Sequence, residues 1–424
     1  MTLRQLLAGV IAVAVAISPL AASSQTRSDR WAGDGGVTAF YTYDLKIPAQ
    51  PGVMLRTEAA SAEVSVPSAG SAYRILYSSL DWRDGKTPIT VSGLIFFPKG
   101  APPKGGWPIL AWSHGTTGVA DVCAPSLNPR SERDRIYLSA WLDDGYAIVA
   151  TDYSGLGTPG AHPYLQYRSE GMAVLDSVRA ALKAYPGKLQ NKIVTIGQSQ
   201  GSGAAIAAAY LAPTYARDLR IKGTVATGIV AHTTHLNGAR QEPVPSLYTE
   251  TDTAKNAGYE MLYFLGTVRS IDPDGIRPED YISDAAWPLL EKAQSTCLSG
   301  LSTYAGQLGV TVDQLYKQPI DELEKRADQA GDFPDVKIRT PVFVGTGLAD
   351  SDAQTATQYN FVSAMCAARD VVEWHYYPGA THSSAVLRSR ADSPAFVEAV
   401  MHGRKIANRC GSLVPPGPLQ APDS

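Results

Sequence analysis

Short apolar runs that alternate with an amphipathic segment constrain this chain more than any other feature. The segment 169–187 has apolar residues at three- and four-residue spacing and ends at Pro186-Gly187, as an amphipathic helix does. Around it lie runs with the length and continuous hydrophobicity of strands buried on both faces: PILAWSHG (108–115), YAIVATDY (146–153) and KIVTIG (192–197). Strand, helix and strand in repetition predict an α/β fold with a mostly parallel central sheet flanked by helices.

Further runs extend this pattern in both directions. Residues 73–100 contain two β-rich runs around Asp84-Gly85, which predicts an antiparallel hairpin. Later strands are predicted in IKGTVATGIVA (221–231), TPVFVGTGLAD (340–350) and VVEWHYYPGATH (371–382), and a closing helix in SPAFVEAVMHGRKIA (393–407). Residues 25–70 are polar and mixed, and no element is predicted there.

A stretch of helix and loop interrupts the sheet pattern between residues 232 and 335. It contains amphipathic segments such as DTAKNAGYEMLYFLGTVRSI but no clear strand, and strands resume after it. We therefore interpret 232–335 as a helical cap inserted into one core, whose two parts are 25–231 and 336–411. The tail 412–424 is Pro-rich and is predicted to be disordered.

The first residues predict export. After Arg4 an uncharged apolar run extends from Leu6 to Leu20, and the small residues that follow suit cleavage before Gln25. The run is short for a bilayer span and lacks a basic flank, so 1–24 is interpreted as a signal peptide, with an uncleaved anchor as the alternative. The mature chain is therefore expected to be secreted or periplasmic.

Cysteine content and charge bear on several classes of function. Export permits disulfides, and the four cysteines are Cys123, Cys297, Cys366 and Cys410. Four cysteines allow three connectivities, of which we favour Cys123–Cys297 with Cys366–Cys410. The absence of a C-x-x-C pair from the sequence argues against a zinc site. A net charge of −3 provides no basic field for nucleic acid.

The sequence GQSQG (197–201) ends the apolar run 192–197 and opens a run of small residues. It matches G-x-S-x-G, in which the serine lies on a strained turn between a strand and a helix. A serine hydroxyl needs a base to take its proton, and the base needs an acid to orient it. In an α/β-hydrolase sheet these groups follow one another along the chain as nucleophile, acid and base.

Two later loops meet this requirement. Asp350 follows the apolar run of 340–350, and His382 lies in the loop after the next apolar run. Ser199, Asp350 and His382 are therefore the candidate nucleophile, acid and base. The alternatives left open for these three roles are Ser202, Asp352 and His375.

Backbone donors for an oxyanion are predicted at two places. Gln200 follows the nucleophile at the start of a helix, where its N–H is free to bind an anion. The turn HGTTG (114–118) follows an early strand, and Thr116 or Thr117 can supply a second N–H. Such a site requires neither a metal ion nor a redox cofactor.

Two further motifs carry weaker signals. GLGTPG (155–160) matches G-x-G-x-x-G, but Pro159 opposes the helix that a dinucleotide site needs there. HTTH (232–235) has two histidines without the glutamate of H-E-x-x-H, so a hinge of the cap is preferred to a metal site.

With these residues in place, the chain resembles the secretory lipase family of α/β-hydrolases, which includes fungal lipase A-type enzymes and bacterial exported esterases. The resemblance is carried by WSHGTTGVADVCAPS, GYAIVATDYSGLGTPGAHPYL, VLDSVRAAL, IGQSQGSGAA and the GLAD and PGATH loops. It implies an α/β-hydrolase core, a helical cap inserted between nucleophile and acid, and hydrolysis of carboxylic esters. It further implies the triad Ser199, Asp350 and His382, oxyanion donors at Gln200 and Thr116-Thr117, and a disulfide from Cys123 to the cap.

We therefore expect a serine esterase or lipase that forms an acyl-enzyme from a small-molecule or lipid ester. Transient contact with lipid interfaces is expected, and the oligomeric state is left open. One alternative is a peptidase or amidase on the same fold. The other is a non-catalytic exported binding protein on a hydrolase scaffold.

Overall fold

The central sheet confirms the α/β fold class. The computed structural model describes residues 29–244 and 253–423, so the predicted signal peptide lies outside the described residues. Within them, a nine-stranded sheet has the order β1-β2-β3-β5-β4-β6-β7-β8-β9. The strands are β1 (Met54–Ala59), β2 (Ala69–Leu80), β3 (Pro88–Pro98), β4 (Trp107–Ser113), β5 (Ala147–Thr151), β6 (Leu189–Gln198), β7 (Ile221–Thr227), β8 (Val342–Gly347) and β9 (Val372–Tyr377).

The sheet is antiparallel at one edge and parallel over the rest. Strands β1, β2, β3 and β5 pair antiparallel in that order. The pairs β5–β4, β4–β6, β6–β7, β7–β8 and β8–β9 are all parallel. The carboxyl ends of the parallel strands therefore share one edge of the sheet, which is where open α/β sheets bind ligands.

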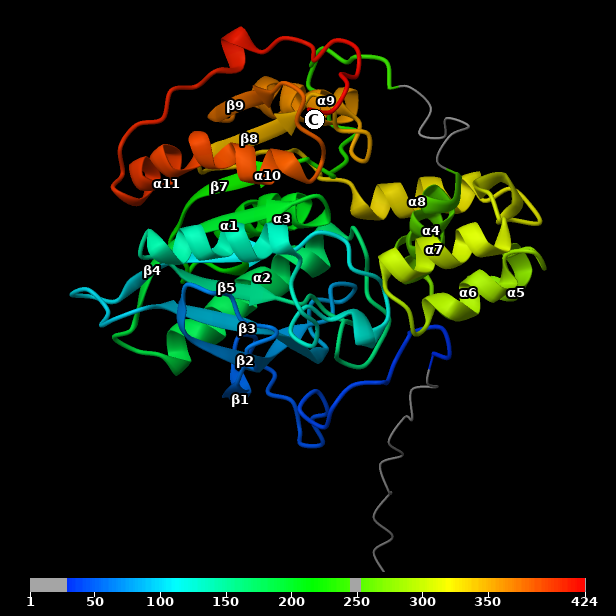
Figure 1. Ribbon diagram of the computed structural model, residues 1–424, viewed down its shortest axis with the longest axis horizontal. Helices are drawn as coiled ribbons and strands as arrows, with labels where there is room; N and C mark the ends of the chain where they lie inside the picture. Colours follow the sequence, from blue (N-terminus) through cyan, green and yellow to red (C-terminus); the bar gives the residue numbers. More distant parts are fainter. Residues whose placement is uncertain (1–28, 245–252, 424) are drawn as a thin grey trace, which may run out of the picture.

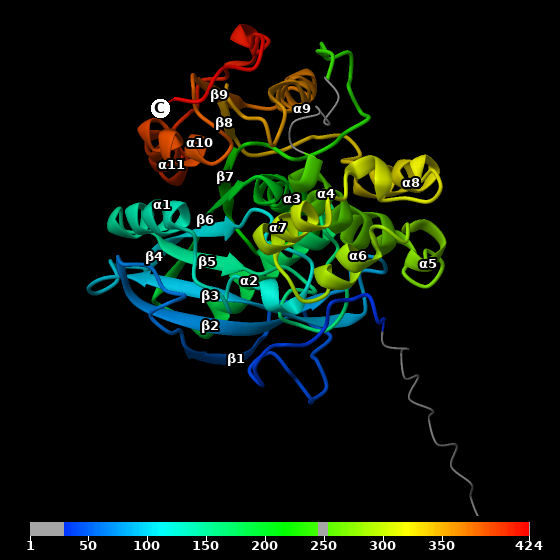
Figure 2. The same cartoon turned by 45° about the vertical axis from the view of Figure 1, so that its right-hand side comes forward.

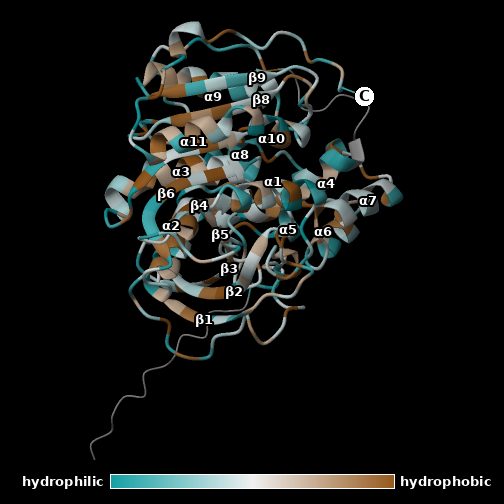
Figure 3. Ribbon diagram, turned by 60° about the vertical axis from the view of Figure 1, so that its left-hand side comes forward, coloured by the Kyte–Doolittle hydropathy of each residue, from teal (hydrophilic) through white to brown (hydrophobic). Residues whose placement is uncertain are grey.

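Helices cover both faces of this sheet (Figure 1). Side chains of β4 alternate between two hydrophobic clusters, because Ile109 packs with α2 and α3 whereas Leu110 packs with α1 and α11. Figure 3 shows α3 and β8 largely in the brown of hydrophobic residues. The core helices are α1 (Glu132–Asp143), α2 (Tyr167–Ala184), α3 (Gln200–Tyr215), α9 (Thr355–Ala367), α10 (Ser384–Arg388) and α11 (Ser393–Met401).

A second group of helices lies between β7 and β8 in the sequence and beside the sheet in space (Figures 1 and 2). It has its own hydrophobic cluster, which includes Met261, Leu289 and Leu301 and also takes in Val119 and Tyr164 from the core. We call this group the cap; its predicted limits of 232 and 335 stay a prediction. Its helices are α4 (Thr253–Tyr263), α5 (Pro278–Tyr281), α6 (Trp287–Ala293), α7 (Leu298–Leu308) and α8 (Asp321–Gly331).

Two disulfides join distant segments and match the favoured pairing. Cys123 pairs with Cys297 across 174 residues, and Cys366 pairs with Cys410 across 44. Directly after Cys297, the backbone N–H of Leu298 donates to the Thr117 carbonyl at 2.8 Å. The disulfide therefore ties the start of α7 to Cys123, and the hydrogen bond ties it to the HGTTG turn.

The structure overturns the prediction that the tail 412–424 is disordered. The Tyr376 hydroxyl donates to the Val414 carbonyl at 2.7 Å, and the Gln420 N–H donates to the Leu348 carbonyl at 2.9 Å. The Asp423 N–H donates to the Gly379 carbonyl at 2.9 Å. Composition alone was misleading, because a Pro-rich segment can be ordered by hydrogen bonds to the loops that it crosses.

The part of the chain before residue 70 contains one strand for which the sequence gives no clear signal. β1 is an edge strand that pairs only with β2, and its burial falls from half-buried to exposed along its length. An edge strand of this kind carries little hydrophobic pattern. No helix within 29–244 and 253–423 is both long and apolar enough to cross a membrane.

Candidate active site

Ser199 lies on a strained turn between β6 and α3. Its φ of 58° is in the left-handed region, which non-glycine residues rarely adopt. The two flanking glycines make the turn possible: a Cβ on Gly197 would lie 1.9 Å from the Gly201 carbonyl oxygen, and one on Gly201 would lie 2.0 Å from the Ser113 carbonyl oxygen. The local sequence therefore presents the Ser199 side chain at the carboxyl end of the sheet.

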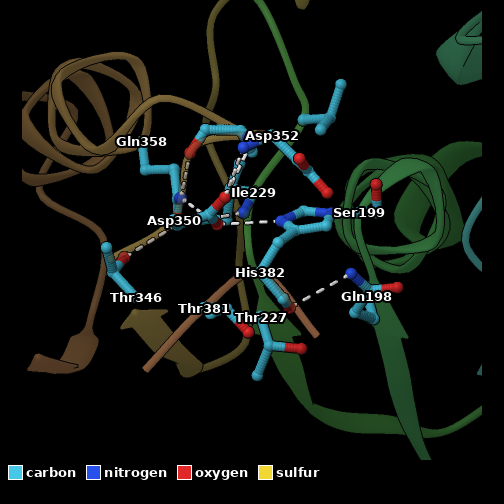
Figure 4. A network of polar contacts seen from close by, with 12 residues as sticks. Gln198, Ser199, Thr227, Ile229, Thr346, Asp350, Asp352, Gln358, Thr381 and His382 are labelled. Carbon is cyan, nitrogen blue, oxygen red and sulfur yellow. Dashed lines mark hydrogen bonds and ion pairs between the residues drawn. The ribbon is translucent and has the colours of Figure 1, made fainter. Parts of the chain in front are cut away.

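Asp350 and His382 meet at the same edge of the sheet. The loop after β8 carries Asp350, and the loop after β9 carries His382. His382 Nδ1 lies 2.8 Å from Asp350 Oδ2, and the Asp350 side chain is fully buried. Figure 4 shows the imidazole ring of His382 between the Asp350 carboxylate and Ser199. The three residues predicted from the order of motifs are thus brought together.

The Asp350 carboxylate is surrounded by hydrogen-bond donors. Its Oδ1 accepts the backbone N–H groups of Asp352 and Ala353 at 3.0 and 2.9 Å. Its Oδ2 accepts from Gln358 Nε2 at 2.9 Å as well as bonding His382. Four donors hold the carboxylate in one orientation.

Gln358 is a member of this site that the sequence did not indicate. It lies on α9, and its Oε1 accepts from the Thr346 hydroxyl at 2.9 Å and from the Ile229 N–H at 3.2 Å. These bonds fix the amide so that its NH₂ faces Asp350 (Figure 4). A lone glutamine inside a helix gives no sequence signal for this role.

The alternative residues occupy other positions. Asp352 forms an ion pair with Lys255 of the cap. His375 lies within β9 and stacks on Phe343 at a ring-centroid distance of 5.0 Å. The Ser202 hydroxyl donates to the Ser199 carbonyl at 2.5 Å and accepts the Val230 N–H at 3.1 Å. Within residues 29–244 and 253–423, the Asp352 and His375 side chains form no hydrogen bond or ion pair with Ser199, Asp350 or His382, and of these three residues Ser202 contacts only the Ser199 backbone.

A cavity of about 430 Å³ opens between the core and the cap next to these residues. Both Ser199 and His382 lie on its wall. Most of the exposed surface of the wall is apolar or aromatic. Polar side chains line it as well, and they include the acidic residues Glu170, Glu260, Asp328 and Asp352. The cavity residues that come from the cap include Tyr259, Glu260, Tyr263, Thr267 and Asp328.

The two candidate oxyanion segments lie on the Ser199 side of this cavity. Gln200 is the first residue of α3, where backbone N–H groups have no partner within the helix. Thr116 lies on the cavity wall, and its hydroxyl pairs with the Tyr164 hydroxyl at 2.8 Å. Thr117 is absent from the cavity wall within the described residues, and its carbonyl is bonded to the cap. Tyr153 stabilises the HGTTG turn, because its hydroxyl donates to the His114 carbonyl at 2.9 Å.

Comparison with known proteins identifies the family of the chain. The family model for secretory lipases matches residues 127–351, more than half of the chain, and its span includes Ser199 and Asp350. The chain belongs to the secretory lipase family. Members of this family are carboxylic ester hydrolases that act on lipid esters. Membership in a secretory family also indicates an exported protein.

Individual relatives of this secretory lipase are distant. A secreted triacylglycerol lipase of Malassezia globosa is 23% identical over 88% of this chain and 80% of that protein. A lipase of Candida albicans is 37% identical, but the alignment spans only 26% of each protein. Another from the same yeast is 38% identical over 23% of this chain and 21% of that protein.

Solved structures show the same fold. Candida antarctica lipase A in its closed state superposes with a TM-score of 0.66 at 18% identity, covering 91% of this chain and 89% of that one. The rice cell wall degrading esterase of Xanthomonas oryzae superposes with a TM-score of 0.58 at 16% identity, covering 82% and 97%.

A buried polar network supports the turn of this secretory lipase behind Ser199. The Gln200 side-chain amide donates to Glu170 Oε1 at 2.8 Å and lies 3.0 Å from His162 Nε2. Burial raises the pKa of Glu170 to about 8 and lowers the pKa of His162 to about 3. Both groups are therefore neutral near pH 7, which removes the cost of buried charge. His162 lies within the stretch GYAIVATDYSGLGTPGAHPYL, but the sequence gives no role to either His162 or Glu170.

Glu170 should make stability depend on pH. Its folded pKa lies above the ordinary value of 4.5, so the folded chain binds more protons than the unfolded chain between about pH 5 and 8. Stability therefore falls as pH rises through this range, by at most about 1.4 kcal/mol per pH unit from this group. We expect urea unfolding to show a shallower decline for Glu170→Gln. The exposed Glu132→Gln serves as control and should follow the wild type; equal slopes for all three proteins would contradict the assignment.

The two weaker motifs lie outside this constellation. In GLGTPG, Gly155 and Gly157 have positive φ, and the next helix, α2, begins ten residues later at Tyr167. In HTTH, the Nδ1 atoms of His232 and His235 lie 3.9 and 3.7 Å from the carboxylate of Asp332, where the chain leaves the cap. In the part of the chain that the structure describes, no group of three or more His, Cys, Asp or Glu is placed to hold a metal ion.

Proposed function

We propose that this secretory lipase hydrolyses esters with Ser199 as nucleophile, His382 as base and Asp350 as the acid that orients the base. The observation that carries the proposal is the 2.8 Å contact between His382 Nδ1 and Asp350 Oδ2 beside a cavity that Ser199 lines. The strained backbone of Ser199 supports the same assignment, because strain of this kind gathers at functional sites.

Acylation begins with attack of Ser199 Oγ on the ester carbonyl carbon. His382 Nε2 takes the hydroxyl proton as the new C–O bond forms, and Asp350 stabilises the resulting imidazolium. The bond to the alcohol oxygen then breaks, and His382 returns the proton to the leaving alcohol. Asp350 is well suited to its role, because Gln358 and two backbone N–H groups fix it independently of His382.

Backbone N–H groups stabilise the negative charge on the tetrahedral oxygen. The first donor is Gln200, at the N-terminus of α3. For the second, the place of Thr116 on the cavity wall favours its N–H over that of Thr117. Loss of one such donor typically costs about 3 kcal/mol of transition-state stabilisation.

Deacylation repeats these steps with water in place of the alcohol. His382 takes a proton from water as it attacks the acyl carbon, and returns it to Ser199 Oγ as the carboxylic acid leaves. The protein atoms alone supply every proton transfer. Because relatives of this chain are named lipase and secreted triacylglycerol lipase, we propose a lipid ester as the substrate. We further propose that the enzyme acts in the periplasm or outside the cell.

Covalent labelling tests this proposal directly. A fluorophosphonate probe reacts with an activated serine, so we expect one label per chain, on the peptide that contains Ser199, as read by mass spectrometry. An excess of p-nitrophenyl ester, present before the probe is added, should slow labelling because the ester competes with the probe for Ser199. Folded protein that takes no label would instead support a non-catalytic binding protein on the same scaffold, and a label on Ser202 would reassign the nucleophile.

A further inference from the structure

One acidic side chain in the substrate cavity has no part in the proposed reaction. Glu170, on α2, lines the cavity and is 2% exposed. Its Oε1 accepts the Leu165 N–H at 3.0 Å and the Gln200 amide at 2.8 Å. Its Oε2 has no hydrogen-bond partner among residues 29–244 and 253–423.

The surroundings of Glu170 favour its neutral, protonated form. No Lys or Arg belongs to the described wall of the cavity, so the carboxyl has no cationic partner there. Burial raises its pKa to about 8. Because both contacts to Oε1 are donated to it, the proton is best placed on Oε2. A buried carboxylic acid with a free O–H costs stability unless something binds it.

We propose that Glu170 is a specificity-determining residue that binds a hydroxyl group on the part of the substrate held in the cavity. This inference rests on the proposed function, since the cavity holds substrate only if Ser199 is the nucleophile. A hydroxyl fits because it can accept the Oε2 proton and can also donate to a carboxyl oxygen. The substrates favoured are therefore esters that carry a hydroxyl on an otherwise apolar acyl chain or alcohol.

Several polar side chains that share the cavity wall with Glu170 are already paired. The Tyr164 and Thr116 hydroxyls bond each other, and the Tyr263 hydroxyl donates to Asp328 at 3.0 Å. The Asp352 carboxylate is paired with Lys255. Glu170 thus combines deep burial with an unpaired polar atom close to Gln200, the residue that follows the nucleophile. Sites built to bind a substrate hydroxyl discriminate strongly against analogues that lack it.

Matched substrates test the proposal. In one series, p-nitrophenyl octanoate is compared with octanoates that carry one hydroxyl at successive positions along the acyl chain. In the other, the octanoate ester of a simple alcohol is compared with the monoester of the matching diol. We expect wild-type kcat/KM to favour at least one hydroxylated member by about tenfold over its plain partner. The series that shows the preference identifies whether acyl chain or alcohol contacts Glu170.

Two variants identify the side chain responsible. Glu170→Gln keeps both a donor and an acceptor and should keep most of the preference, whereas Glu170→Met should reduce it to about unity. The exposed Glu132→Met is the control and should leave the ratio as in the wild type. The plain ester is the reference throughout, so a general loss of activity cancels in the ratio.

Two results would overturn the inference. One is a wild-type enzyme that shows no preference for a hydroxylated ester in either series. The wild-type measurement alone would establish this result. The other is a preference that survives Glu170→Met in protein whose circular dichroism is native. Failure of the proposed function looks different, because the wild type would then fail to hydrolyse the plain ester as well.

Discussion

Ser199→Ala should lower kcat for p-nitrophenyl ester hydrolysis by about 10⁴- to 10⁶-fold. Without the hydroxyl, no acyl-enzyme can form, and water must attack the ester directly. The residual rate comes from the oxyanion donors, which the substitution leaves in place. The fold should survive, because the Ser199 side chain makes no capping hydrogen bond to α3 and alanine is a smaller side chain on the same turn.

Ser202→Ala is the matched control for this prediction. Ser202 lies three residues further along, and its hydroxyl bonds the Ser199 carbonyl and the Val230 N–H. Its loss should reduce kcat by less than about tenfold, through a small change in the turn. The measurement is the initial rate of ester hydrolysis by each variant. Circular dichroism shows whether each variant is folded. If Ser199→Ala kept wild-type activity and Ser202→Ala lost it, the nucleophile would be Ser202.

The sequence predicts most of the parallel sheet because burial on both faces leaves a local signal. The runs at 108–115, 146–153 and 192–197 lie on β4, β5 and β6, each in the centre of the sheet. The edge strand β1 carries no such signal, since one of its sides has no neighbouring strand. Local pattern therefore predicts the interior of the sheet better than its edge.

The order of the candidate triad could be predicted for a related reason. Parallel strands end at one edge, so residues just after three such strands must meet there, however far apart they lie in the sequence. Asp350 and His382 could thus be named from sequence. The contacts of Gln358, Glu170 and His162 could not be predicted, because each depends on how segments pack against the sheet in three dimensions.

Sequence alone does not distinguish Thr116 from Thr117 as the second oxyanion donor. Both residues follow β4 in the same turn, and the sequence gives no reason to prefer either. Our preference for Thr116 comes from the cap, because the Leu298 N–H contacts the turn from one side. The Thr117 carbonyl accepts this hydrogen bond from the cap, whereas Thr116 lies on the cavity wall.

Asp350→Asn should lower kcat by about 10⁴-fold, the size of the effect when a triad aspartate becomes an amide. An amide cannot accept the His382 N–H with its nitrogen, so the imidazole loses the tautomer that the reaction needs. The structure adds a second effect. All four groups around Asp350 are donors, and asparagine offers one acceptor oxygen where the carboxylate offers two. The unmatched donors should also lower the free energy of unfolding by about 1–3 kcal/mol.

Asp352→Asn separates this expectation from the alternative acid in the same loop. Asp352 contacts Lys255 with its side chain and gives Asp350 only its backbone N–H, which the substitution keeps. We expect kcat within about threefold of the wild type, since a partly exposed ion pair contributes little. Single-turnover acylation rates and urea unfolding of both variants provide the measurement. A large loss of acylation with Asp352→Asn but not with Asp350→Asn would transfer the role to Asp352, and the buried cluster of donors around Asp350 would then require another explanation.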